Sequence, residues 1–293
     1  MTTATTTPVQ SALNLVITLQ PGLQAGIDEA GPALMGGITK AAEELGTLHD
    51  ARVVALGDSR VGLFTTYDGD FDTYMTDFTK VAGPMFDGLL GRCVDAPPLP
   101  VAKNVDEFLT WVRAHDLPSI HGIYSAYPTL TVQDIRALAA KAGVPIGENL
   151  SAGGTPVMSP LNLVMTLKPG VGPGVQSAGP ALMAKMLTAS DQIGTLHDAR
   201  FVLLDQSTAS LFTIYDGDFE TYIADFVKYM GDIFDALLPH MVDAPALPVE
   251  KNAQEFLEWV RARDLPSVHG FYSAYPNLSV QDIRALAARA EGA

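Results

Sequence analysis

The chain has 293 residues, of which 47% are hydrophobic, and carries a formal net charge of −15 at pH 7. This length and apolar content predict about two globular domains and exclude a disordered chain. The acidic charge would repel a phosphate backbone, so nucleic acid is not an expected partner.

The single cysteine, Cys93, excludes an internal disulfide and a metal site built from cysteines. The first residues contain neither a basic region nor an apolar core of the kind that a secretory signal has. No apolar run approaches the roughly 20 residues of a membrane span. We therefore expect a cytoplasmic protein with no membrane partner.

The sequence consists of two similar copies. Gly46–Arg52 (GTLHDAR) returns unchanged as Gly194–Arg200, an offset of 148 residues (from 46 to 194), and Tyr67–Phe71 (YDGDF) returns as Tyr215–Phe219. The copies align from Leu13 onward without a gap. We expect a flexible N-terminus over residues 1–12, a first repeat over 13–143, a linker rich in Gly, Pro, Ser and Asn over 144–159, and a second repeat over 160–293.

In chain order, each copy predicts strand, helix, strand, strand, helix, helix, strand and helix. In the first copy the expected segments are a strand over Leu13–Leu19, a helix over Ala33–Leu45, strands over Arg52–Leu56 and Leu63–Tyr67, a helix after the N-cap Asp70, a helix over Asp106–Ala114, a strand over Ser119–Tyr127, and a helix opened by a capping box at Thr131.

This order of elements indicates an α+β fold with a ferredoxin-like βαββαβ core in each copy. Such an antiparallel sheet has helices on one face and leaves the other face open. We predict that the two tandem repeats pack their open faces together into one barrel with a pseudo-twofold axis. Two independent domains are the alternative. They would expose two apolar sheet faces, at a free-energy cost of about 25 cal/mol per Å² of apolar surface.

The alternation of side chains along the strands indicates which residues face the barrel interior. In the first strand, Asn14 and Thr18 lie opposite the apolar face and should point inward. In the fourth strand the more polar face carries His121, Ser125 and Tyr127. Their equivalents in the second copy are Asn162, Thr166, His269, Ser273 and Tyr275. Buried polar groups need partners, so this set predicts either an internal hydrogen-bond network or a ligand that the residues bind.

Two histidine pairs recur, His49 with His197 and His121 with His269. Histidine titrates near neutral pH, so all four are candidate acid–base residues; the alternative is that each anchors a strand end by bonding to the backbone. His49 precedes Asp50, but neighbours on a strand point to opposite faces, so their adjacency does not by itself make a dyad. Without a His-Glu-x-x-His spacing or a compact His–carboxylate cluster, the sequence predicts no metal site.

Two further recurring features are an acidic turn and a strand arginine. Asp68 and Asp216 are candidate catalytic acids or bases, although a glycine turn followed by an N-cap explains the same residues structurally. Arg52 and Arg200 lie in otherwise apolar strands. Each arginine predicts either a pairing with a neighbouring acid or a site for an anionic substrate.

The phrases His49-x-Ala51-Arg52, Tyr67-Asp68-Gly69 and Tyr127-Pro128 resemble domains of the dimeric α+β barrel superfamily, nearest to poorly characterised bacterial proteins related to peroxidases and monooxygenases. The resemblance covers both copies. It implies a cofactor-free monooxygenase, an isomerase or cyclase, or a haem enzyme such as the dye-decolorising peroxidases and chlorite dismutases. The peroxidase motif Gly-x-x-Asp-Gly is replaced here by Tyr-Asp-Gly-Asp. If haem binds, the resemblance leaves His121 or His269 as the axial ligand.

Our leading interpretation is an enzyme that binds a small, mostly apolar organic molecule in the barrel, most consistent with an oxidoreductase that works with no cofactor or with haem. A haem-dependent peroxidase or oxygenase, a non-catalytic binding protein, and an isomerase or cyclase are the alternatives. A homodimer is compatible with the sequence. The copies diverge where Gly36-Gly37 becomes Ala184-Lys185, and such volume changes would make ligand binding differ between them.

Overall fold

The computed structural model describes residues 8–23, 25–57, 59–147 and 157–292. The first half contains β1 (Gln10–Thr18), α1 (Ala25–Leu45), β2 (Leu48–Gly57), β3 (Arg60–Asp68), α2 (Phe71–Leu90), the short 3₁₀ helix η1 (Val101–Lys103), α3 (Val105–His115), β4 (Ser119–Ser125) and α4 (Val132–Lys141). The second half contains β5 (Met158–Thr166), α5 (Gly172–Ile193), β6 (Leu196–Asp205), β7 (Thr208–Asp216), α6 (Phe219–Leu237), η2 (Leu238–His240), α7 (Ala253–Arg261), β8 (Ser267–Ser273) and α8 (Val280–Glu291).

The element order predicted from the sequence is confirmed in both halves. The boundaries differ in detail, since β1 already begins at Gln10 and β5 at Met158, inside the segments expected to be the N-terminus and the linker. Residues 1–7 of that N-terminus and 148–156 of that linker lie outside the described residues.

The strands form two four-stranded antiparallel sheets, and one edge strand of each sheet comes from the other half. The first sheet has the order β1-β3-β2-β8 and the second the order β4-β6-β7-β5. Thus β8 pairs with β2, with Ala51 opposite Tyr272, and β4 pairs with β6, with Tyr124 opposite Ala199. This reciprocal exchange excludes two independent domains. The predicted α+β barrel is confirmed, and the exchange is a feature that the sequence did not predict.

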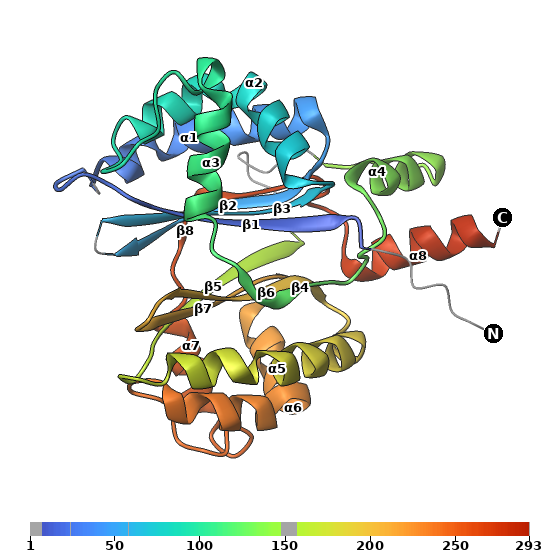
Figure 1. Ribbon diagram of the computed structural model, residues 1–293. Helices are drawn as coiled ribbons and strands as arrows, with labels where there is room; N and C mark the ends of the chain where they lie inside the picture. Colours follow the sequence, from blue (N-terminus) through green and yellow to red (C-terminus); the bar gives the residue numbers. More distant parts are fainter. Residues whose placement is uncertain (1–7, 24, 58, 148–156, 293) are drawn as a thin grey trace.

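The two sheets lie face to face, with α1, α2 and α3 outside the first sheet and α5, α6 and α7 outside the second (Figure 1). The helices α4 and α8 lie together at one end of the barrel (Figure 1). Along its sides the barrel is closed by bridges between Leu15 and Asp116 and between Leu163 and Asp264. The sheets therefore share one interior.

Local sequence signals explain where the helices begin. The carboxylates of Asp70 and Asp218 accept backbone N–H bonds at the first turns of α2 and α6, as expected for N-caps. The capping box predicted at Thr131 is present, with Asp134 as its second member. These caps fix the loops that lead from β3 and β7 into the helices, and Asp68 and Asp216 lie two residues before those caps.

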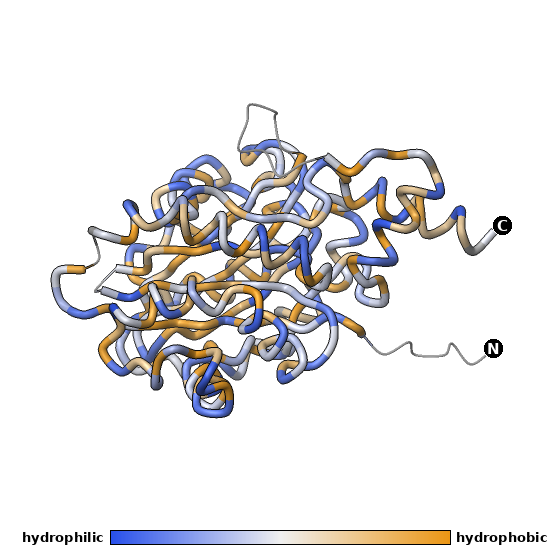
Figure 2. Tube along the Cα trace, turned by 90° about the horizontal axis from the view of Figure 1, so that it is seen from above, coloured by the Kyte–Doolittle hydropathy of each residue, from blue (hydrophilic) through white to orange (hydrophobic). Residues whose placement is uncertain are grey.

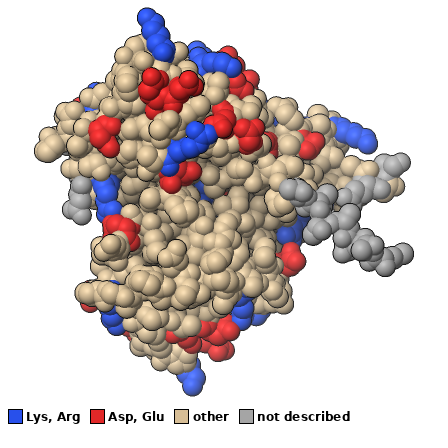
Figure 3. All heavy atoms as spheres, viewed as in Figure 1, with Lys and Arg blue, Asp and Glu red and all other residues tan. Residues whose placement is uncertain are grey.

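Three apolar clusters follow from the layers: one between each sheet and its helices, and one between the sheets. In the last, the rings of Phe64 and Phe212 lie 3.9 Å apart, centroid to centroid, and Val54 and Val202 are fully buried beside them. Apolar residues run along the central strands (Figure 2). Charged side chains concentrate over the outer helices, and few lie across the middle of the face that Figure 3 shows. None of the described helices is long and apolar enough to cross a membrane.

Candidate functional site

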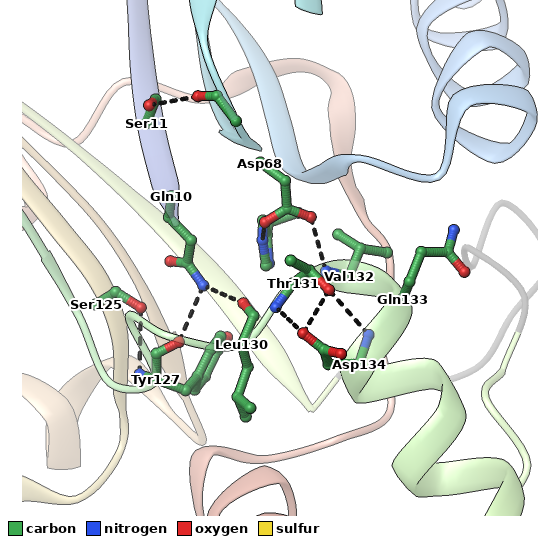
Figure 4. A network of polar contacts seen from close by, with 12 residues as sticks. Gln10, Ser11, Asp68, Ser125, Tyr127, Leu130, Thr131, Val132, Gln133 and Asp134 are labelled. Atoms are coloured by element: carbon green, nitrogen blue, oxygen red, sulfur yellow. Dashed lines mark hydrogen bonds and ion pairs between the residues drawn. The ribbon is translucent and has the colours of Figure 1, made fainter. Parts of the chain in front are cut away.

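Three polar residues from both halves form a hydrogen-bonded relay at one end of the barrel interior. The Nδ1 atom of His49 lies 2.6 Å from the hydroxyl of Tyr275, and its Nε2 atom lies 2.7 Å from Oδ1 of Asp68. The second oxygen of Asp68 accepts the backbone N–H of Val132 at 2.8 Å, at the first residue of α4 (Figure 4). A carboxylate is a suitable partner for the free backbone N–H groups at a helix N-terminus.

The second half repeats the relay. The Nδ1 atom of His197 lies 2.8 Å from the hydroxyl of Tyr127, and its Nε2 atom lies 2.7 Å from Oδ1 of Asp216. The other oxygen of Asp216 accepts the N–H of Val280 at 2.8 Å, at the start of α8. Because each tyrosine follows an exchanged strand, each relay joins a histidine of one half to a tyrosine of the other.

The hydrogen bonds assign the direction of the proton in each relay. An ionised carboxylate only accepts, so Nε2 of His49 donates to Asp68 and Nδ1 is left to accept the proton of the Tyr275 hydroxyl. Burial raises the pKa of Tyr127 and Tyr275 well above the ordinary value, so both phenols are neutral donors. The relay thus holds a phenol against a base that a carboxylate orients.

The two relays meet near the pseudo-twofold axis, where the rings of Tyr127 and Tyr275 lie 6.0 Å apart at 76°. The turn that carries Tyr127 is held by Gln10, whose amide donates to the carbonyls of Tyr127 and Leu130 (Figure 4). Ser125 also accepts the N–H of Tyr127 at 3.2 Å. The counterpart of Gln10 is Met158, so the surroundings of the two relays differ although the relays do not.

A buried cluster of two arginines and two aspartates lies between the sheets. Arg52 of β2 donates to the carbonyl of Thr213 at 2.7 Å, and Arg200 of β6 donates to the carbonyl of Thr65 at 2.7 Å. Each guanidinium therefore crosses to the opposite sheet. The carboxylate of Asp198 lies 3.7 Å from Arg52 and 3.5 Å from Arg200. Burial lowers the pKa of Arg52, and an arginine side chain keeps its charge in proteins.

The other aspartate of the cluster is Asp50, whose carboxylate lies 3.5 Å from Arg200. Several polar atoms in the cluster have no hydrogen-bond partner among the described residues. They include Nε and Nη2 of Arg52, Nε of Arg200 and Oδ1 of Asp50, all buried. The three arginine nitrogens among them are donors, and buried donors are suited to an oxyanion, since each adds a directed N–H bond in a medium of low dielectric. The cluster can therefore stabilise negative charge beside the relays.

The cluster makes stability depend on pH. Burial, and next the charge of Asp50, raise the pKa of Asp198 from 3.8 to about 6. Between these values the folded chain holds a proton that the unfolded chain has released, so the unfolding free energy falls as pH rises from 4 to 6, by up to about 3 kcal/mol. Denaturant titrations across this range should show the fall in the wild type and a flatter profile in Asp198→Asn. The surface variant Asp191→Asn should keep the wild-type slope; an Asp198→Asn profile as steep as that of the wild type would contradict the assignment.

The structure brings together most of the residues singled out in the sequence. Ten of them lie at or beside the site: the relay residues His49, His197, Asp68 and Asp216, the tyrosines Tyr127 and Tyr275, the serines Ser125 and Ser273, and the arginines Arg52 and Arg200. Asn14 and Asn162 are buried on the interior face as expected, and their amides donate to Leu117 and Leu265. These hydrogen bonds join β1 and β5 to the segments that lead into β4 and β8.

Four expected interior residues lie elsewhere. His121 and His269 are exposed, with φ of 60° and 57°, and their imidazoles lie over Gly179 of α5 and Gly31 of α1. The prediction that they point into the barrel is wrong because a His-Gly pair in the left-handed region interrupts the alternation of the strand. Thr18 and Thr166 were also expected inside and are exposed, since each is the last residue of its strand.

The described residues do not fit a haem. The imidazoles proposed as axial ligands lie at the surface against helix glycines, whereas an axial ligand needs an enclosed pocket beside it. Among the described residues, no group of three His, Cys, Asp or Glu side chains could hold a metal ion. Cys93 is buried, and burial raises the pKa of its thiol to about 11, which makes it a poor nucleophile.

Sequence reasoning missed the partners that complete the site. The pairing of His49 with Asp68 joins β2 to the end of the neighbouring β3, and the identical 19-residue spacing of His197 and Asp216 was the signal that could have revealed it. The contribution of Asp50 and Asp198 was also missed, because Asp50 was considered only as a neighbour of His49 and its counterpart Asp198 was not considered. The cross-half partners could not be found without knowing that β4 and β8 exchange.

Comparisons with known proteins give distant likenesses only. No protein-family model and no curated protein matches the sequence. A provisionally assigned monooxygenase from Fusobacterium nucleatum is 9% identical over 93% of this chain and 97% of its own, with a TM-score of 0.44. An anthrone oxidase-like protein (12% identity, 92% and 94% covered, TM-score 0.29) and a chlorite dismutase from Candidatus Nitrospira defluvii (14%, 86% and 95%, TM-score 0.29) also align. At these TM-scores the likenesses do not identify a reaction.

Proposed function

We propose that the protein is a small-molecule enzyme of the oxidoreductase class that acts on a mostly apolar organic molecule without haem and uses the relays for proton transfer. The observation that carries this proposal is the duplicated Asp–His–Tyr relay, in which a carboxylate orients a base and the base holds a phenol. The dimeric α+β barrel superfamily that the sequence resembles includes cofactor-free monooxygenases, and oxidation by O₂ is the reaction that we propose ahead of isomerisation or cyclisation.

The relay lets a tyrosine exchange a proton without leaving an isolated charge in the interior. When Tyr275 gives its proton to His49, the imidazolium lies between the tyrosinate and the carboxylate of Asp68. The Nε–H and Nη2–H groups of Arg52, which have no hydrogen-bond partner among the described residues, can then stabilise the anion of a substrate that has lost a proton. A phenol or an activated methylene suits this site, because its anion is electron-rich. Oxidation of a methylene by O₂ to a carbonyl and water balances without an added reductant.

A second candidate is a non-catalytic binding protein in which the relays hold the halves together. It is favoured by one observation: each relay ties an exchanged strand of one half to the hairpin of the other, and every relay side chain is at most 10% exposed. In that case the hydrogen bonds contribute to stability and no substrate reaches them. The two candidates differ in turnover, which an oxygen electrode measures.

The test compares oxygen uptake by the wild type and by Tyr127→Phe/Tyr275→Phe with a panel of phenols, hydroquinones and anthrones. The double variant keeps both rings and removes only the hydroxyls, so the fold should persist, as circular dichroism will show. General acid–base groups contribute about 10² to 10⁴ in rate, and we expect kcat to fall by at least about 100-fold. His115→Asn is the matched control, because that imidazole lies on Trp111 outside the barrel.

Wild-type turnover in a folded Tyr127→Phe/Tyr275→Phe protein rejects the acid–base role of the relays. A wild type that binds members of the panel saturably and consumes no oxygen with any of them supports the binding protein instead. A Soret band that is retained after haem addition and lost in a His121→Ala/His269→Ala variant would overturn the haem-free assignment.

A further inference from the structure

A groove on the outside of the first sheet is separate from the relays. It lies between α1 and α2, which run side by side over that sheet (Figure 1), and has a volume of about 210 Å³. Its walls are apolar side chains, among them Leu34, Met85 and Leu89, and the same three residues line a void of about 10 Å³ beneath it that reaches Val53 and Leu63 of the sheet. The groove is therefore the open end of an apolar space that extends to the strands.

Small residues leave space between the two helices at this place. Ala30 and Ala33 of α1 and Gly88 of α2 line the groove, together with Pro84. Gly37 is packed against Met85, and a Cβ added to Gly37 would come within 2.9 Å of the Met85 sulfur. A larger residue at position 37 would therefore push this side chain into the groove.

The equivalent place in the second half carries an ion pair. There Lys185 stands where the first half has Gly37, and Asp232 stands where it has Pro84. The ammonium of Lys185 lies 2.7 Å from the carboxylate of Asp232, so an ion pair bridges α5 and α6. Ala236 also replaces Gly88. The copies thus differ in a concerted way, in the helix pair over the sheet and not in the relays.

One charged residue lines the groove of the first half. Arg92 lies at its edge and donates to the carbonyl of Gly88 at 2.7 Å. None of the ion pairs among the described residues includes Arg92, so its charge is available to a ligand. His240 occupies the equivalent position of the second half. A guanidinium favours a carboxylate, since two parallel N–H bonds can form.

We propose that this groove binds one small organic carboxylate per chain, with its apolar body on Leu34, Met85 and Leu89 and its carboxylate at Arg92. About 150 Å³ suffices for one benzene molecule, so the groove has room for a single aromatic ring or a short aliphatic chain with its acid group. The site faces away from the second sheet, whereas Arg52 and Phe64 face toward it, so binding here does not depend on catalysis by the relays.

Isothermal titration of the full chain with 3-phenylpropionate tests the proposal, with 3-phenylpropan-1-ol as the uncharged analogue. The variant Gly37→Lys/Pro84→Asp installs between α1 and α2 the ion pair that bridges α5 and α6 in the second half. We therefore expect the variant to fold and the groove to close. We expect one equivalent bound by the wild type and an affinity at least about tenfold lower in this variant. Arg92→His should lower the affinity for 3-phenylpropionate by about threefold and leave the affinity for the alcohol unchanged. Lys80→Ala, an exposed change on α2 outside the groove, should bind as the wild type does.

Two equivalents per chain, or no saturable heat up to about 10 mM carboxylate, would overturn the proposal. So would wild-type affinity in a Gly37→Lys/Pro84→Asp protein whose circular dichroism matches the wild type. If Arg92→His lowers the affinities for the acid and for the alcohol equally, the placement of the ligand carboxylate at Arg92 is wrong. A Met85 methyl NMR signal that shifts on titration in the wild type, and is unmoved in the closed variant, would place the ligand directly.

Discussion

Residues 8–147 expressed alone should form a homodimer with twice the mass of the monomer. In the full chain the edge of β2 pairs with β8 of the other half, and β4 pairs with β6. A separate first half keeps a free β2 edge and a free β4. The sequence of β4 (SIHGIYS) is nearly that of β8 (SVHGFYS), so β4 of one copy can take the place of β8 in another. Exchange between copies would also restore both relays, since Tyr127 and His49 are retained.

Light scattering after size exclusion measures the mass of this fragment. Mixing it with residues 157–293, unfolded together and refolded, should give a one-to-one complex with the circular dichroism of the full chain. A folded monomer would contradict the expectation, because β4 would then have closed onto β2 of its own half. A fragment that stays unfolded at all concentrations would contradict it equally, since the paired copies bury the same apolar interior as the full chain.

Arg52→Met should lower the unfolding free energy by about 3 to 5 kcal/mol. The side chain is fully buried, and the change removes the bond to the Thr213 carbonyl and leaves the Asp198 carboxylate with one cation fewer. Methionine keeps an unbranched apolar stem in place of the arginine stem, so the loss measures charge and hydrogen bonding more than volume. Guanidinium unfolding followed by tyrosine and tryptophan fluorescence provides the measurement.

Arg60→Met is the matched control, because Arg60 pairs with Asp205 at the partly exposed ends of two hairpins. An exposed pair contributes at most about 1 kcal/mol, so this variant should be near the wild type. Adding Asp198→Asn to Arg52→Met should recover part of the loss, because it removes a buried carboxylate that has lost one of its two cations. Equal stability of Arg52→Met and Arg60→Met would show that the buried cluster does not depend on the guanidinium.

The sequence predicted the elements because their signals are local. The apolar alternation around Leu13, the N-cap Asp70 and the capping box at Thr131 each depend on residues close in the chain, and all are confirmed. The barrel followed from the open face of each repeat. These signals can be recognised without knowing which strand pairs with which.

The strand exchange could not be predicted from the sequence, because the candidate strands for each sheet edge are too similar to distinguish. The strands β2 and β6 are nearly identical, as are β4 and β8, so either fourth strand suits either sheet edge. The choice is made by the connections between elements. The same cause hid the relays, because Tyr275 meets His49 only after the exchange. The orientation of His121 was missed for a different reason, a positive φ in a non-glycine residue.

The exchange also has a consequence for synthesis of the chain on the ribosome. The first sheet needs β8, which begins at Ser267, whereas β2 ends at Gly57, about 210 residues earlier. At about 5 to 20 residues per second, the β2 edge waits roughly 10 to 40 seconds for its partner. During that time β4, already outside the ribosome, is a near-identical competitor, as is β4 of a neighbouring nascent chain. Slower translation of the second half therefore favours misassembly, and the yield of native protein should depend on codon usage after residue 147.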